Sequence, residues 1–179
     1  MAINDACFDA HALQRARGAA STSSGWVETN GGILNPLRVH VRPQQYLYRF
    51  ASSNTPHAAR LHGCWWIEYE VVTKIAKFVR DQHATPRDAA RYFLALPWSW
   101  TNVDRLVRAR LIAKVDAYRG AGKPAAGVHA RDAATRFIPP QHIHELYQLY
   151  IPGMETSDIA GRAFADVSDV DIWRAQVFA

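Results

Sequence analysis

The chain has 179 residues, 49% of them hydrophobic, and it contains six tryptophans. This length and composition exclude global disorder and predict one domain with a sizeable core. The formal net charge of +5 is compatible with a nucleic-acid or phosphate-bearing partner, although the charge alone does not indicate one. Cys7 and Cys64 fit no metal-finger spacing, so we expect two free thiols in a reducing compartment.

Targeting and membrane signals are missing from the sequence. No apolar stretch approaches the roughly 20 residues that cross a bilayer. Residues 1–17 lack the apolar core of a secretory signal. We therefore expect no membrane span, and either a cytoplasmic location or export by a leaderless route.

The first 32 residues predict a flexible N-terminal segment. Residues 6–17 can form a short helix, and residues 18–32 are rich in glycine and serine. A single α+β domain is expected over residues 33–179. It begins with two strands, because apolar and polar residues alternate over 37–41 and again over 46–50.

Three helices are predicted next. Residues 67–82 have apolar residues at helical spacing, and Thr85-Pro86-Arg87-Asp88 is a typical helix start that precedes Pro97. A third helix is predicted over 101–120, on the spacing of Val107, Leu111 and Val115. Strands are expected again over 143–151 and 170–178. This order favours an α+β fold with a mixed or antiparallel sheet and a central helical block.

Arg49 is the most informative single residue. It lies between Tyr48 and Phe50 in the second predicted strand, where an unpaired charge would be costly. Its guanidinium therefore requires an anion. One interpretation is a structural salt bridge to Glu68 or Glu70, and the other is a ligand diphosphate, with Ser52 at the strand end as a further donor.

Trp65 and Trp66 follow Gly63 and Cys64 directly. Adjacent residues of a strand point to opposite faces, so one indole can enter the core while the other lines a cleft. Indoles stack well on nucleobases and on nicotinamide. Two core aromatics at a sheet edge are the simpler interpretation.

Other motifs predict less. On a strand His142 and His144 would share a face, but a catalytic zinc usually needs three protein ligands, and nothing in the sequence places His129 beside them, so no metal is expected. Phosphate-loop, dinucleotide-fingerprint and nucleophile-elbow signatures are absent from the sequence. Basic residues gather along the predicted third helix and its end: Arg105, Arg108, Arg110, Lys114, Arg119 and Lys123.

Taken together, short pieces between Tyr46 and Gly153 resemble the ADP-ribosyltransferase superfamily. Leu47-Tyr48-Arg49 resembles the family's early arginine strand, and Gly63-Cys64-Trp65-Trp66 is similar in place to its second strand. The resemblance implies that Arg49 contacts the NAD phosphates and that a late glutamate orients the nicotinamide ribose. Glu145 is the candidate for this glutamate. Gln148, which precedes Leu149-Tyr150-Ile151-Pro152, fits the family position better and would remove the carboxylate.

The resulting hypothesis is an NAD-dependent ADP-ribosyltransferase or NAD glycohydrolase, a toxin or effector with a protein or nucleic-acid target. Arg49 and Glu145 would be catalytic, and Arg49, Ser52, Trp65 and Trp66 would bind NAD. The alternative is a non-catalytic module whose basic helix face contacts nucleic acid or an acidic protein. A degenerate transferase fold that only binds lies between the two.

Overall fold

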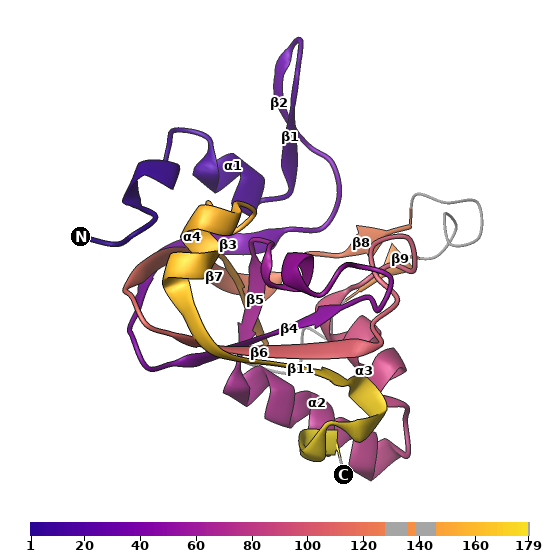
Figure 1. Cartoon of the computed structure of the whole chain (residues 1–179). Coiled ribbons are helices and arrows are strands. Elements are labelled where there is room, and N and C mark those ends of the chain that lie inside the picture. Colours follow the sequence, from indigo (N-terminus) through magenta and orange to yellow (C-terminus); the bar gives the residue numbers. More distant parts are fainter. Residues whose placement is uncertain (128–135, 139–145, 179) are drawn as a thin grey trace.

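The computed structural model of the chain describes residues 1–127, 136–138 and 146–178 (Figure 1). Its centre is a seven-stranded antiparallel sheet in the order β11-β6-β4-β5-β10-β7-β3. The predicted α+β class with an antiparallel sheet is therefore confirmed. The strands of this sheet are β3 (Ile33–Val41), β4 (Tyr46–Ala51), β5 (Trp65–Glu68), β6 (Arg105–Leu111), β7 (Val115–Gly122), β10 (Tyr147–Tyr150) and β11 (Phe164–Asp171).

Helices and two small hairpins surround this sheet. The helices are α1 (Ala12–Ala16), α2 (Tyr69–Gln82), α3 (Pro86–Leu94) and α4 (Ser157–Ala163). One hairpin pairs β1 (Ala19–Thr22) with β2 (Gly25–Glu28), and the other pairs β8 (Ala125–Ala126) with β9 (Arg136–Phe137). In the described part of the chain, no helix has both the length and the hydropathy to cross a bilayer.

The sheet is forked in its middle. β4 and β5 pair only at Leu47 with Glu68 and at Tyr48 with Ile67, whereas β4 pairs with β6 along its whole length. Beyond these two pairs β4 continues beside β6 and β5 continues beside β10. Figure 1 shows β5 upright, with β4, β6 and β11 running across it. The fork opens at Arg49 on one side and at Trp66 on the other.

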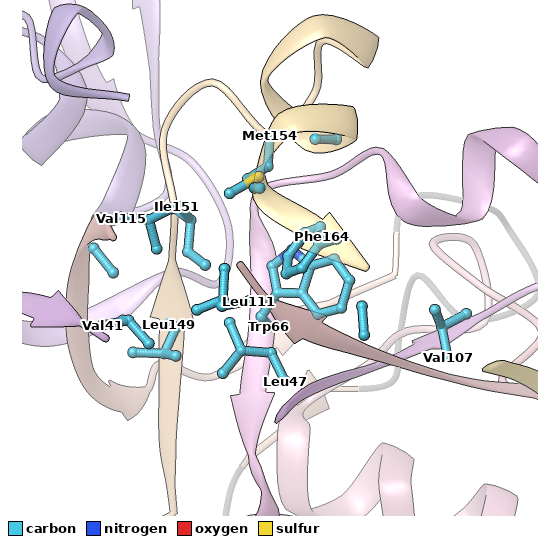
Figure 2. Close-up of a cluster of buried hydrophobic side chains, with 14 of the residues drawn as sticks. Val41, Leu47, Trp66, Val107, Leu111, Val115, Leu149, Ile151, Met154 and Phe164 are labelled. Carbon is cyan, nitrogen blue, oxygen red and sulfur yellow. The ribbon is translucent and has the colours of Figure 1, made fainter. Parts of the chain in front are cut away.

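Two cores cover the two faces of the sheet. On one face Leu47, Trp66, Leu149 and Phe164 pack together beneath α4, as Figure 2 shows. On the other face α2 and α3 cover β4, β5 and β6, and Ile75 is among the fully buried residues there. Burying each large side chain of this kind contributes about 1.5–3 kcal/mol, so the cores hold both arms of the fork.

The first two predicted helices are present. The Oγ1 of Thr85 accepts a hydrogen bond from the amide of Asp88, and Pro86 is the first helical residue, as the sequence predicts. The helix predicted from residue 67 begins at Tyr69 instead. Ile67 and Glu68 belong to β5 because their backbones pair with β4.

The predicted third helix over 101–120 is wrong, since this region forms the antiparallel strands β6 and β7. Val107, Leu111 and Val115 are spaced by four, and a spacing of four satisfies both the helical and the strand period. Ala109 and Ala117 complete the strand pattern, and all five residues are buried in one core. Because alanine is only a weak hydrophobic signal, the strand period of two could not be recognised at these two positions.

The N-terminal and C-terminal segments contribute to the packed structure. Ala12 and Ala16 of α1 are fully buried, and the buried side chain of Asn4 exchanges hydrogen bonds with the backbone of Asp116. At the other end, β11 finishes at Asp171 and is followed by short 3-10 turns, so the strand predicted over 170–178 is largely wrong. Of the strand predicted over 143–151, residues 143–145 lie outside the described residues.

Candidate functional site

A pocket of about 500 Å³ lies at the fork of the sheet. Protein pockets for small molecules usually have volumes of about 300–1,000 Å³. Strands β4, β5 and β10 form its floor, the loop after α3 forms one wall, and the N-terminal segment forms another. Its lining includes Arg15, Gly18, Asn30, Gly31, Gly32, Tyr48, Arg49, Phe50, Trp65, Trp66, Leu96, Trp100, Thr101, Lys123 and Gln148.

Arg49 lies at the point where β4 leaves β5, and no carboxylate of the described residues forms an ion pair with its guanidinium. The Nε and Nη1 atoms are buried without a hydrogen-bond partner, and Cζ lies 5.5 Å from the centre of the Trp66 ring. Burial lowers the pKa of Arg49 to about 10, so the side chain remains charged at neutral pH. A buried, unpartnered charge is costly to the fold, and a ligand anion would remove that cost.

Gly63 makes room for this guanidinium. Its φ is +151°, and a Cβ at this position would lie 2.7 Å from Cζ of Arg49 and closer still to Nη1. The amide of Gly63 donates to the carbonyl of Met154, which fixes the backbone at this short distance. No side chain fits at position 63 unless Arg49 moves.

Glu68 and Glu70 were the protein carboxylates expected to pair with Arg49. Glu68 Oε2 accepts a hydrogen bond of 2.8 Å from Nε of Arg119. Glu70 lies in the first turn of α2, where a carboxylate favours the positive end of the helix dipole. Within the described residues neither glutamate forms an ion pair with Arg49, so the salt-bridge interpretation finds no support.

The other cations of the pocket wall have partners. Arg15 donates to the carboxylate of Asp9 and to the hydroxyl of Tyr150. Lys123 Nζ lies 2.6 Å from a carboxylate oxygen of Glu28. Among the described lining residues Arg49 is therefore the cation that lacks a counter-charge, and none of these lining residues is a carboxylate.

The two adjacent indoles point to opposite faces of β5, as the alternation of side chains along a strand requires. Trp66 is 1% exposed, packs in a tilted arrangement against Phe164 with ring centres 4.6 Å apart, and donates its Nε1–H to the carbonyl of Gly63. Trp65 is partly exposed and packs edge-on against Tyr150 at 5.1 Å. Both line the pocket, so Trp65 offers ligand contact while Trp66 mainly supports Arg49.

The remaining predicted site residues differ in their positions. Gln148 lines the pocket with Arg49, and its Nε2 donates to the carbonyl of Leu94 at 3.3 Å. Ser52 is not among the lining residues, because its hydroxyl accepts from the amide of Asn102 and bonds to Thr101. Glu145 lies outside the described residues, as do the histidines 129, 142 and 144.

Sequence reasoning missed the two walls of the pocket. Arg15, Gly18, Ala19 and residues 29–32 form one wall, and Trp100 and Thr101 form part of the other. The pair Gly31-Gly32 suggested only a flexible loop, and Trp98-Ser99-Trp100 was assigned no role. Two tryptophans beside a proline, outside any predicted helix or strand, were the available signal for a binding loop.

Cys64 is close to Arg49 but is unsuited to nucleophilic chemistry. Burial raises the pKa of its thiol to about 12, and the nearby carboxylate of Glu155, which accepts a hydrogen bond of 2.7 Å from Sγ, acts in the same direction. The thiolate is the reactive form, so its fraction at neutral pH is very small. In the part of the chain that the structure describes, no group of three or more His, Cys, Asp or Glu could hold a metal ion.

Comparisons of the chain with models of protein families, with curated proteins and with solved structures found no match.

Proposed function

We propose that this protein binds NAD in the pocket at the fork and cleaves its bond to nicotinamide, as an ADP-ribosyltransferase or NAD glycohydrolase. The observation that carries the proposal is Arg49, whose Nε and Nη1 are buried at the pocket with no hydrogen-bond partner among the described residues. A forked guanidinium of this kind matches the oxygens of a phosphate. The partly exposed Trp65, which lines the same pocket, suits a flat aromatic ring such as nicotinamide.

Each proposed role follows from side-chain chemistry. Arg49 holds the diphosphate and thereby fixes the glycosidic bond in the pocket. Gln148 offers an amide to the ribose hydroxyls. Loss of nicotinamide leaves positive charge on the ribose, and a carboxylate stabilises such charge in a site that excludes water. Glu145 is the proposed source of this carboxylate, three residues before Gln148 in the chain.

The experiment has a binding arm and a turnover arm. NAD is titrated into the protein by calorimetry, and nicotinamide release is followed with and without candidate protein targets. Arg49→Lys retains the charge but loses the two parallel N–H donors of the guanidinium. We expect this variant to weaken NAD binding by about tenfold or more, because a charge-assisted hydrogen bond typically contributes about 1.5–3 kcal/mol. Arg108→Lys is the matched control, since Arg108 is on β6 outside the pocket lining.

Three outcomes would decide between enzyme and binding protein. NAD binding that needs Arg49, together with release of nicotinamide that Glu145→Gln abolishes, supports the enzyme. NAD binding without release, with Gln148 in place of the family glutamate, supports a fold that only binds. Absence of NAD binding at millimolar concentration would overturn the proposal.

The alternative function required a basic helix face that contacts nucleic acid or an acidic protein, and the structure has no helix over these residues. Residues 105–111 and 115–122 are strands in different arms of the sheet. Arg105 is paired with Asp169 and Arg110 with Asp166. These charges are partly neutralised within the protein, so we do not propose this function.

A further inference from the structure

Trp100 is an exposed indole at the pocket. It lines the pocket from the loop after α3 and is 45% exposed, whereas Trp66 on the floor is 1% exposed. An indole is a large apolar surface, and leaving nearly half of it in water forgoes the free energy of its burial. An aromatic surface of this kind beside a cavity is typical of a ring-binding position.

The opposite wall supports one edge of this indole. A Cβ at Gly31 would lie 2.7 Å from Cη2 of Trp100, so the ring is placed against the bare α-carbon of the glycine. Gly31 has a φ of +65°, which favours glycine in any case. The wall is tied to β8, because the side chain of Asn30 accepts a 2.8 Å hydrogen bond from the amide of Ala126 and donates to its carbonyl.

The loop that carries Trp100 is fixed at both ends. The guanidinium of Arg91 donates to the carbonyl of Leu96 at 2.8 Å and to that of Thr101 at 2.6 Å, and Cζ lies 3.6 Å from the centre of the Trp98 ring. Arg91 itself is 3% exposed. Because the indole is held before any ligand arrives, stacking on it costs little conformational entropy.

We infer that Trp100 stacks on a second aromatic ring of the ligand, the purine of a dinucleotide. The inference rests on the proposed function, and it assigns the two ends of NAD: nicotinamide beside Trp65 and adenine on Trp100, with the diphosphate at Arg49 between them. Trp100 then selects dinucleotides and adenine nucleotides over nicotinamide mononucleotide.

The test compares wild type and Trp100→Ala by calorimetry with four probes: NAD, ADP-ribose, ADP and nicotinamide mononucleotide. Alanine substitution at a stacking position weakens binding by roughly 5- to 150-fold. We expect this loss for the three adenine-containing probes and unchanged affinity for nicotinamide mononucleotide. Equal NAD affinity in both proteins, or an equal loss for nicotinamide mononucleotide, would overturn the role of Trp100.

Failure of the inference can be distinguished from failure of the proposed function. Arg49-dependent NAD binding that is indifferent to Trp100→Ala leaves the function standing and removes the adenine position. ADP binding that depends on Trp100, in a protein that neither binds NAD nor releases nicotinamide, keeps the adenine position and removes the NAD function.

Two further variants show whether a loss of binding comes from misfolding. Trp173→Ala removes a tryptophan that is 54% exposed and does not line the pocket, and it should leave all four affinities unchanged. Gly31→Ala keeps Trp100 but displaces its indole, and it should weaken NAD and ADP binding several-fold. If Trp100→Ala fails to fold by circular dichroism, Gly31→Ala with unaltered affinity for both probes overturns the inference.

Discussion

The α-carbon of Gly63 faces the guanidinium of Arg49, so that a Cβ at position 63 would lie 2.7 Å from Cζ. This relationship explains how β4 and β5 can separate around a buried charge without a large side chain filling the space. We expect Gly63→Ala to move Arg49 and to weaken NAD binding about as much as Arg49→Ala does. Calorimetric titration of both variants checks this. Gly161→Ala, where a Cβ meets no atom within 4 Å, is the control.

The buried charge of Arg49 should lower the free energy of unfolding of the protein. Its Nε and Nη1 are buried without a partner in the part of the chain that the structure describes, and each such group costs roughly 1–3 kcal/mol. We therefore predict that Arg49→Met, which keeps most of the volume and removes the charge, raises the free energy of unfolding by about 1–2 kcal/mol while it abolishes NAD binding. Urea denaturation measures the first effect. A loss of stability would mean that Arg49 has a structural counter-charge.

Gln148 lines the pocket, and Gln148 and Glu145 are the two candidates for the position of the family glutamate. If the position of Gln148 is the one that faces the ribose, Gln148→Glu introduces the missing carboxylate and should raise the rate of nicotinamide release by about tenfold or more. Gln148→Met is the control for packing. If Glu145 supplies the carboxylate, Gln148→Glu places two like charges near each other and lowers the rate instead, while Glu145→Gln abolishes it.

Asp116 makes the stability sensitive to acid. Burial raises the pKa of this carboxyl, but hydrogen bonds from Arg38 and His40 outweigh burial and hold the pKa below its ordinary value of 3.8. A depressed pKa contributes stability above pH 3.8, and this contribution is lost as the pH falls below that value.

Asp116→Asn should therefore flatten the decline of the unfolding free energy below about pH 4. At pH 7 it should cost about 1–3 kcal/mol, since the hydrogen bonds of a buried charged group are removed. Urea denaturation from pH 3 to pH 7 measures both quantities. Asp81→Asn is the comparison, because Asp81 pairs with Lys77 on the exposed surface of α2. A parallel decline in wild type and Asp116→Asn would contradict this role for Asp116.

Local sequence determined the elements whose signals are unambiguous. The alternation of Tyr46–Ala51, the Thr85 cap and the apolar spacing of α2 each act within a few residues, so they could be recognised without knowledge of the fold. The sequence also indicated that the charge of Arg49 needs an anion, because an arginine among aromatic residues of a strand is costly whatever surrounds it.

Only the tertiary structure decided the rest. A spacing of four fits helix and strand equally, so the pairing of β6 with β4 and β11 was needed to make residues 105–111 a strand. The fork depends on where the ladder between β4 and β5 stops, which no local pattern records. Trp100 and Gly31 lie 69 positions apart, and only the packing of the N-terminal segment against the loop after α3 brings them to one pocket with Arg49.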